Sequence, residues 1–336
     1  MKFGLFLASQ HGPGESMAAR FAEHVEQVEV AREVGFVSLF TGHHYLSTPY
    51  QMLQPVPVLS YVASRVPGMS IGPGVLLLAL VNPVYVAEEM ATLDVLTGGR
   101  LIFGVGLGYR EEEYDAFGVP RAGRVRRFTT HLDIVRRLWA GEAVTYETDY
   151  CTLRNATLVS RPLQQPHPPI WIAANNDGAV RRAARLGDTW FIAPHSRLAV
   201  LEAQMALYRE ERARLGLPMP EDIPLFRECF VGEDRRTVHS EARPYLERKY
   251  QTYVTWGQDR AMPAHDPLAV PYEELVGDRF IVGTPEECVA QIRRYRQVLG
   301  ITHLVLRVHW AGLPHERVLR SLRLIGREVM PALARA

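Results

Sequence analysis

The segment from Ser70 to Arg110 constrains the fold more than any other part of the chain. It opens with an apolar run, continues through an Asn-Pro helix start, an amphipathic helix and a glycine turn, and reaches a second apolar run at 101–105. Three glycines, Gly104, Gly106 and Gly108, stand at the end of that run. The pattern predicts a complete strand–helix–strand unit. Parallel α/β proteins bind ligands at the carboxyl ends of their strands, so we expect a site at this rim.

Strand and helix patterns alternate along almost the whole chain, with about eight strands, most of them followed by a helix. This alternation favours a (β/α)8 TIM barrel with insertions over an open doubly wound sheet, which usually splits into two halves at this length. Neither such a boundary nor an internal repeat is visible, so residues 1–336 are expected to form one domain. The expected strands are 2–8, 36–40, 69–72 with the apolar run 75–78, 101–105, 170–173, 189–192, 224–231, 280–282 and 303–308. The expected helices include 121–139, whose basic outer face contains Arg124, and the closing helix 314–329, and Thr284 and Glu287 predict a capping box at a helix start.

Two segments interrupt the alternation and are interpreted as insertions. Residues 141–169 contain a predicted surface hairpin followed by a proline-rich stretch. Residues 256–278 are polar, carry three prolines and show no periodicity. A long irregular loop in a compact domain is typical of a lid, so we expect 256–278 to be the most mobile part of the barrel.

The composition excludes several classes of protein. The 38 Lys and Arg nearly balance the 37 Asp and Glu, and no basic stripe points to a nucleic-acid partner. The longest apolar run, 75–81, is too short for a membrane span, and residues 1–10 indicate a first strand rather than a signal peptide. The three cysteines form no CxxC pair, which favours a reduced, cytoplasmic protein without structural zinc.

His43 and His44 directly follow the second predicted strand, on the same rim. Adjacent side chains of an extended segment point to opposite faces, and no H-x-H or HExxH pattern accompanies the pair, so a metal-dependent hydrolase is the weaker hypothesis. A general acid/base or a hydrogen-bond donor to a bound cofactor fits better. The alternative is one packed histidine beside one that faces solvent.

Glycine-rich segments at the rim each allow two interpretations. Gly72-Pro73-Gly74-Val75 indicates either a bulge where a ligand approaches the backbone or a plain strand edge. The G-x-G-x-G spacing at 104–108 is a weak dinucleotide motif but leaves room for a flat or phosphorylated ligand. The turn at 175–179 can present backbone N–H groups to a phosphate, or Asn176 or Asp177 can simply cap the following helix.

Taken together, these segments resemble the luciferase-like monooxygenase family, the flavin-dependent barrel enzymes that include bacterial luciferase. The resemblance covers nearly the whole chain, and its pieces follow the order that they have in the family. They are KFGLFL at 2–7, GF-x-SLF-x-GHHY at 35–45, NP-x-x-VAEE-x-ATLD-x-LTGGRL-x-FGVGLG at 82–108, RP-x-Q-x-PHPPIWIAAN at 161–175, AARLGD at 183–188 and VGTPEEC at 282–288.

The resemblance implies a barrel that binds FMN or the deazaflavin coenzyme F-420 at its carboxyl end. It further implies a two-component monooxygenase that uses O2 on a small organic substrate, takes its reduced FMN from a separate NAD(P)H:flavin reductase, and forms a homodimer. Two alternatives stay open within the same family. One is a reductase or dehydrogenase that depends on coenzyme F-420, and the other is a relative that binds flavin without turnover.

The family's functional residues carry over by position. His43 matches the catalytic, flavin-side histidine of its E-H-H segment, Gly42 replaces the glutamate, and His44 is expected to point away from the flavin. The non-proline cis peptide of the family matches Gly74–Val75. Leu107, Asn176 and Ala179 stand where luciferase uses polar phosphate ligands, so backbone N–H groups and Arg110 are expected to bind the phosphate. The complete expected cofactor set is Ala8, His43, Gly74, Val75, Leu76, Gly106, Gly108, Tyr109, Arg110, Ala174, Asn175, Asn176, Gly178 and Ala179, with no metal ligand.

Overall fold

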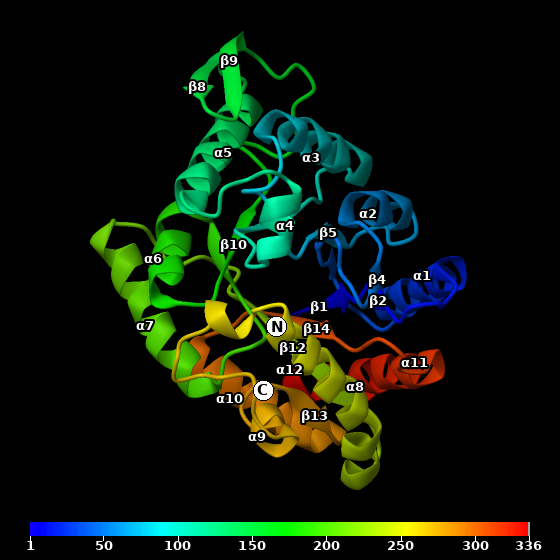
Figure 1. Ribbon diagram of the computed structural model, residues 1–336. Coiled ribbons are helices and arrows are strands. Elements are labelled where there is room, and N and C mark those ends of the chain that lie inside the picture. Colours follow the sequence, from blue (N-terminus) through cyan, green and yellow to red (C-terminus); the bar gives the residue numbers. More distant parts are fainter. Residues whose placement is uncertain (335–336) are drawn as a thin grey trace.

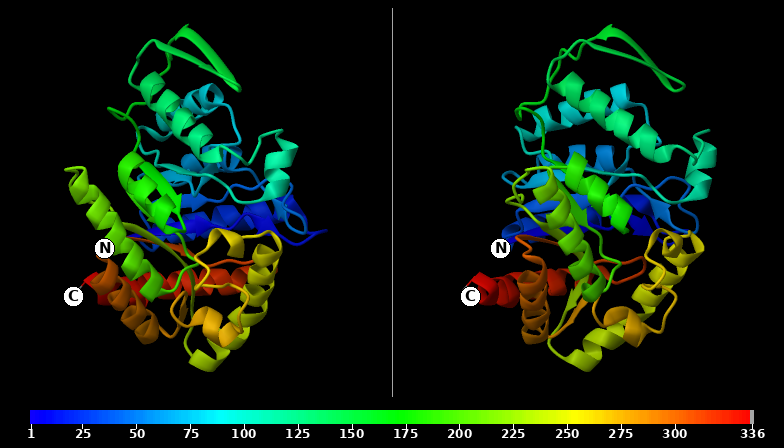
Figure 2. Two further views of the ribbon diagram at one scale, coloured as in Figure 1. Left: turned by 60° about the vertical axis from the view of Figure 1, so that its left-hand side comes forward. Right: turned by 90° about the vertical axis from the view of Figure 1, so that its left-hand side faces the viewer.

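The computed structural model describes residues 1–334 and shows a parallel β-barrel surrounded by helices (Figures 1 and 2). The strand order is β5-β3-β1-β14-β12-β11-β10-β7-β6, and its two ends, β5 and β6, are successive pieces of the one segment 70–77. The sheet therefore returns on itself, which confirms the expected (β/α)8 barrel. The barrel strands are β1 (Lys2–Leu7), β3 (Ser38–Thr41), β5 (Ser70–Pro73), β6 (Leu76–Leu77), β7 (Phe103–Gly106), β10 (Ile170–Ala174), β11 (Thr189–Ile192), β12 (Pro224–Val231) and β14 (His303–Arg307).

Helices follow the strands and pack on the outside of the barrel. In α3, Asn82 accepts hydrogen bonds from the first backbone N–H groups, Pro83 is the first helical residue, and Gly98 ends the helix with a φ of 69°. The expected capping box of Thr284 and Glu287 begins α10. The helices are α1 (Met17–Glu33), α2 (Pro55–Ala63), α3 (Pro83–Thr97), α4 (Glu111–Ala116), α5 (Arg124–Trp139), α6 (Asp177–Leu186), α7 (Leu198–Arg214), α8 (Arg235–Thr255), α10 (Pro285–Leu299) and α11 (His315–Leu324).

Three elements differ from the sequence-based expectation. The strand expected at 280–282 is β13 (Ile281–Gly283), which pairs with the end of β12 and lies off the barrel path. The helix expected from 121 begins at 124, because Gly123 has a φ of 80° and interrupts the helical backbone. The closing helix, expected over 314–329, ends as α11 and continues through the π-helical turn η2 (Ile325–Val329) into α12 (Met330–Ala334).

Large side chains fill the interior of the barrel, so it is a packed core and not a pore. The rings of Phe6 and Phe226 stack with their centroids 4.2 Å apart. On one side the backbones themselves approach closely, because a Cβ at Gly104 would collide with the carbonyl oxygen of Pro73. The interior cluster consists of Phe6, Phe40, Ile102, Trp171, Phe191, Phe226 and Val305, with Val75 packed against it.

Two small antiparallel pairs lie outside the barrel. β2 (Gln10–His11) pairs with β4 (Gln51–Met52). β8 (Val144–Thr148) and β9 (Cys151–Ala156) form the hairpin expected within 141–169, and it projects from the body of the molecule at the top of Figure 1. The hairpin therefore takes no part in shaping the carboxyl-end rim.

The second insertion, 256–278, is more regular than its sequence suggests. It contains a 3-10 turn, η1 (Asp259–Ala261), and a short helix, α9 (Tyr272–Val276). The fully buried carboxylate of Asp266 accepts from Arg197 Nε at 3.0 Å and from Arg279 Nη2 at 2.7 Å. The sequence pattern does not reveal this anchor, because a buried ion pair produces no repeat of apolar residues. The mobility expected for 256–278 stays a prediction.

Candidate active site

A cavity opens at the carboxyl end of the barrel, and the strand ends on every side of the barrel contribute to its wall. Most of the expected cofactor residues meet there: His43, Gly74, Val75, Gly106, Gly108, Tyr109, Ala174, Asn175, Asn176 and Ala179. Ala8, Leu76, Arg110 and Gly178 are outside the lining. The sequence therefore located the cavity correctly but not every residue of its wall.

His43 lies just beyond the end of β3 and is 5% exposed. Its Nδ1 accepts a hydrogen bond from the Leu77 backbone N–H at 3.2 Å, so the ring proton of the neutral form is assigned to Nε2. Burial, and then the neighbouring His44, lowers the pKa of His43 to about 4. His43 is thus a neutral imidazole at ordinary pH and can donate one hydrogen bond from Nε2.

Glycines make one wall of the cavity almost bare backbone. The Gly74–Val75 peptide is cis, as expected. A Cβ at Gly74 would lie 2.9 Å from the ring of Phe6, and one at Gly106 would lie 2.7 Å from Val75 Cγ2. Neither position has room for a side chain, because Phe6 and Val75 already fill the space where its Cβ would lie. Both glycines also border the cavity, so their backbone forms part of its wall.

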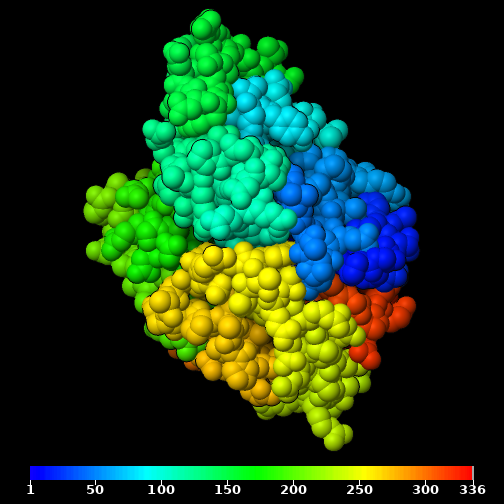
Figure 3. Space-filling model, viewed as in Figure 1, coloured from blue at the N-terminus to red at the C-terminus, as the bar shows by residue number. Residues whose placement is uncertain are grey.

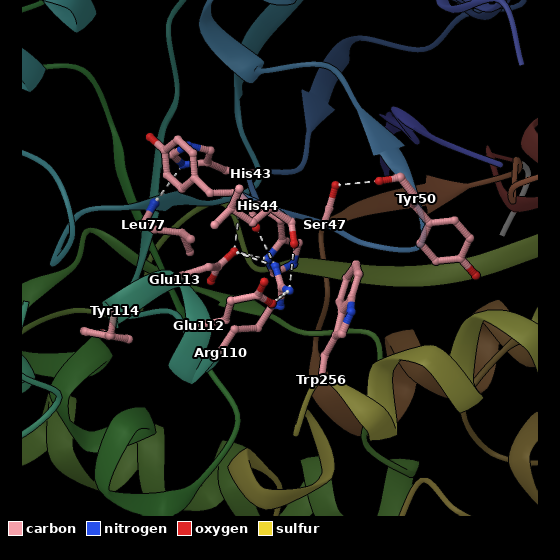
Figure 4. A network of polar contacts seen from close by, with 12 residues as sticks. His43, His44, Ser47, Tyr50, Leu77, Arg110, Glu112, Glu113, Tyr114 and Trp256 are labelled. Carbon is pink, nitrogen blue, oxygen red and sulfur yellow. Dashed lines mark hydrogen bonds and ion pairs between the residues drawn. The ribbon is translucent and has the colours of Figure 1, made fainter. Parts of the chain in front are cut away.

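His44, which was expected to point away from the flavin, also belongs to the cavity wall. Figure 4 shows its side chain beside Glu113. The expectation assumed strand alternation, but β3 ends at Thr41 and the chain is irregular beyond it. His44 Nδ1 lies 2.9 Å from Glu113 Oε1, which also accepts from the Tyr45 N–H at 3.0 Å. Gly42 stands where the resemblance led us to expect a glutamate, and Glu113 supplies a carboxylate in its place. This carboxylate orients His44 rather than His43.

Glu113 is ionised although no part of it is exposed. Burial raises its pKa, but the hydrogen bond and charge of His44, the Tyr45 N–H and the charge of Arg110 outweigh burial and lower it overall. A histidine backed by a buried carboxylate can take up and release a proton during a reaction. The structure thus places a histidine–carboxylate pair beside the neutral donor His43.

Arg110 does not face the cavity, which corrects its expected role as a phosphate ligand. Its guanidinium is buried and donates to the carbonyl oxygen of Leu46 at 3.0 Å and to Glu112 Oε2 at 2.6 Å. It also lies 4.4 Å over the ring of Trp256, the first residue of the 256–278 insertion. These contacts occupy its N–H donors. Arg110 therefore connects the loop after β3 to α4 and to the insertion, and it does not bind a ligand (Figure 4).

Four other arginines line the cavity opening, here called the mouth: Arg121, Arg124, Arg182 and Arg260. Sequence reasoning assigned Arg124 to the outer, basic face of its helix and did not single out the other three. The Nε of Arg182 is buried and has no acceptor among the described residues. Asn176, in the same cavity wall, caps the N-terminus of α6. Its side-chain oxygen accepts a hydrogen bond from the Ala179 N–H at 3.1 Å. Positive side chains around a helix N-terminus form a site for an anion such as a phosphate.

The insertion 256–278 covers part of this mouth. Gln258, Arg260 and Ala261 belong to the cavity wall, and Trp256 Nε1 donates to the Thr48 carbonyl at 2.8 Å. In Figure 3 the segment, coloured yellow to gold, lies against the surface around α4. The segment therefore lies over part of the cavity opening, where the hypothesis of a lid requires it to be.

On the side away from the mouth, the cavity wall contains His195, Tyr253 and Arg307, together with the Phe6 and Phe226 rings. We call Arg307, Phe6 and Phe226 the floor. The sequence analysis did not identify Arg307 or its buried neighbour Glu228. A charged residue inside an otherwise apolar strand, as in PLFRECFV and HLVLR, is the signal that was available for both.

Residues 1–334 contain neither a candidate metal centre nor a membrane-spanning helix. No group of three or more His, Cys, Asp or Glu side chains in this part of the chain is arranged to hold a metal ion. No helix within it is long and apolar enough to cross a membrane.

The chain resembles known proteins over nearly its whole length. Residues 1–303 match the family model described as luciferase-like monooxygenase. The F420-dependent glucose-6-phosphate dehydrogenase of Microbacterium testaceum is 29% identical, over 99% of this chain and 97% of that protein. The oxygenase component of the flavin-dependent trigonelline monooxygenase of Acinetobacter baylyi is 22% identical, over 99% and 96%. The crystal structure of the monooxygenase RslO1 from Streptomyces bottropensis is 27% identical, covers 99% of both chains and gives a TM-score of 0.87.

Proposed function

Because the chain belongs to the luciferase-like monooxygenase family and is an oxidoreductase of its flavin or F420-dependent kind, we propose that it is an FMN-dependent monooxygenase acting on a small organic substrate. The observation that carries this proposal is the make-up of one cavity. It combines an anion site at the mouth, a wall of bare backbone at Gly74 and Gly106, and the neutral donor His43.

The wall residues fit the parts of FMN. The N-terminus of α6, with Arg124 and Arg182, would hold the phosphate, and the glycine wall would take the flat ring system. Reduced flavin supplies the electrons with which O2 is activated. His43 would donate from Nε2 to an oxygen atom at the reacting centre, and the His44–Glu113 pair would exchange a proton there. The interior aromatic side chains keep water away from the reaction.

We also propose a partner and an assembly. A separate NAD(P)H:flavin reductase would supply reduced FMN, as the name of the trigonelline relative, an oxygenase component, suggests for that protein. A homodimer is supported by the exposed apolar side chains of α2 and α3, namely Tyr61, Tyr85 and Leu96. The three free, buried cysteines are consistent with a reducing, cytoplasmic environment.

Coenzyme F-420 is the second candidate, and the number of arginines at the mouth favours it. One phosphate needs fewer than four guanidinium groups, whereas F-420 carries carboxylates in addition to its phosphate. The 29% identity with an F420-dependent dehydrogenase supports the same reading. In that case the chain would be a reductase or dehydrogenase and would not use O2.

Titration of the apoprotein with oxidised FMN, reduced FMN, riboflavin and reduced F-420 decides between these proposals. We expect reduced FMN to bind best, and Arg182→Met to weaken FMN binding about tenfold or more while leaving riboflavin binding unchanged. Selective binding of F-420 would replace the first candidate by the second. Failure of every flavin to bind would overturn both. Binding without O2 consumption or hydride transfer would identify a non-catalytic relative.

A further inference from the structure

Arg307 occupies the floor of the cavity at the end of β14. Its guanidinium carbon lies 4.4 Å from the ring centroid of Phe6 and 5.2 Å from that of Phe226. The residue is 6% exposed, and it borders the cavity. The two rings hold the planar group in place by cation–π contact but leave its N–H donors unused.

The donors of Arg307 are largely without acceptors. Nη1 makes a long hydrogen bond of 3.4 Å to the Tyr253 hydroxyl, and it lies 3.7 Å from Glu228 Oε1. Nε is buried and finds no acceptor in the part of the chain that the structure describes. An arginine presents five N–H donors, so this side chain can still bind an oxygen-bearing ligand.

The charge of Arg307 is also incompletely balanced. Its nearest carboxylate, Glu228, is hydrogen-bonded to Lys249 and accepts from Trp310 Nε1 at 2.6 Å. Burial, and then the charge of Arg307, lowers the pKa of Lys249 to about 7, so Lys249 is partly charged at neutral pH. Arg307 therefore shares its one buried carboxylate with a second basic group. A charge left without a partner in a protein interior is costly, and a bound anion removes that cost.

Among the residues that the structure describes, no carboxylate borders the cavity, so its wall does not supply the missing negative charge. Burial, and then the positive charge of Lys249 and Arg307, holds the pKa of His195 well below its usual range, so this histidine is neutral. Gln10, which accepts from the Tyr253 hydroxyl at 3.2 Å, is neutral as well. The surrounding wall is aromatic, with Phe191 beside the Phe6 and Phe226 rings.

We propose that Arg307 determines substrate specificity by binding a carboxylate of the substrate, which would be a flat, apolar organic acid. The aromatic wall takes the apolar body, and the guanidinium takes the acid group. This inference rests on the proposed function, because it assigns the mouth to the cofactor and the floor to the substrate. One cavity then holds two anionic groups at opposite ends, the phosphate at the mouth and the acid at the floor.

Benzoate and benzamide test the proposal, because they share one shape and differ in charge. We expect the full-length wild-type protein to bind benzoate at least tenfold more tightly than benzamide in calorimetric titrations. Arg307→Met should reduce this ratio to about one, and Arg307→Lys should retain part of it. The matched control is Arg127→Met on α5, which should leave the ratio as in wild type. Its guanidinium carbon also lies 4.4 Å from an aromatic ring centroid, that of Tyr150, but it does not border the cavity.

Three results would overturn the proposal: equal binding of the two probes by wild type, no benzoate binding at millimolar concentrations, or an unchanged ratio in Arg307→Met. Reduced FMN is titrated into the same variants, since an anionic flavin ring offers Arg307 similar chemistry. Weaker FMN binding by Arg307→Met, with benzoate selectivity retained, would assign the residue to the cofactor. If wild type binds benzoate selectively but binds no flavin, the proposed function fails while the floor site remains.

Discussion

Two buried carboxylates beside the cavity, Glu113 and Glu228, have opposite surroundings. Both are fully buried, and in both the neighbouring groups lower the pKa although burial raises it. Glu113 shares one cation, Arg110, with a second acid, Glu112. Glu228 instead is shared by the two basic groups Lys249 and Arg307. One side of the cavity has a surplus of carboxylate and the other a surplus of positive charge.

The difference supports the division of roles proposed above for the two sides. Surplus carboxylate beside His44 suits proton transfer, because it stabilises the charged imidazole that forms during a reaction. Surplus positive charge beside a fixed aromatic wall suits the binding of an anion. The first side comes from the loop after β3 and from α4 with its preceding residue Arg110, whereas the second comes from the strands β12 and β14 and from α8. Loops allow adjustment around a reacting centre, and strands hold a specificity group rigidly.

The largest expected effect is that of replacing His43, which lies on the proposed reactive side of the cavity. We expect His43→Ala to reduce product formed per flavin oxidised by about 10²–10⁴-fold, because the Nε2 donor is lost. Release of hydrogen peroxide should rise correspondingly, while flavin affinity and folding stay nearly intact. Product, peroxide and flavin oxidation are measured in one reaction with a reduced-flavin supply.

His131 on α5 provides the matched control. It is a fully buried histidine whose Nδ1 lies 2.9 Å from the Leu78 carbonyl oxygen, and burial lowers its pKa to about 4, as at His43. It does not line the cavity, so His131→Ala should lower thermal stability without changing product per flavin. A His43 variant with normal product yield would show that His43 only packs. His44, which the sequence suggested as a control, is unsuitable because it lines the cavity.

The second test compares the two carboxylates directly. Glu228→Gln leaves Arg307 buried without a counter-charge and favours the neutral form of Lys249, whose pKa is about 7 with Glu228 present. We therefore expect it to lower the free energy of unfolding by about 3–5 kcal/mol. Glu113→Gln should cost less, about 1–3 kcal/mol, because Arg110 keeps Glu112 and its backbone acceptors. Urea unfolding of both variants measures the difference.

Equal losses in the two variants would remove the proposed distinction between the sides. Addition of benzoate sharpens the test, because Glu228→Gln leaves more uncompensated positive charge on the floor. We therefore expect benzoate to restore part of the stability lost in Glu228→Gln and none of that lost in Glu113→Gln.

The smallest expected effect concerns pH. The pKa of His43 is about 4 in the folded protein and about 6.5 in an unfolded chain, so the unfolded chain binds more protons between these values. Stability is therefore full above about pH 6.5 and falls as the pH drops towards 4, by at most about 3 kcal/mol from this residue. His43→Asn should flatten the decline in urea unfolding at pH 7 and pH 5. Identical slopes for variant and wild type would contradict the assigned burial of the imidazole.

Much of the fold was predictable because barrel formation depends on local patterns. The Asn82–Pro83 helix start, the Gly98 helix end and the capping box at Thr284 all appear in the structure where their residues stand. The insertion 256–278 was predicted less well. Its anchor, Asp266, pairs with arginines about seventy residues before and thirteen after it, and no periodic pattern reports such pairing.

The site was predictable where the backbone itself forms it. Gly74 and Gly106 were found because glycine is needed where a side chain has no room. Charged residues were missed or misplaced, because tertiary contacts decide whether an arginine faces a ligand or a neighbour. Arg110 was expected in the cavity and is held by backbone carbonyls, whereas Arg124 was expected outside and lines the mouth.

The anchor at Asp266 has a consequence for how this rim can vary. Residues 257–265 form a span fixed at both ends, by Trp256 on Arg110 and by Asp266 on Arg279. The entropic cost of closing a loop grows only slowly with its length, so a span with fixed ends tolerates insertion and exchange. Within this span Gln258 and Met262 are buried, so the exposed residues 264 and 265 are the place for insertion. New sequence grafted there would alter access to the cavity while both anchors stay in place.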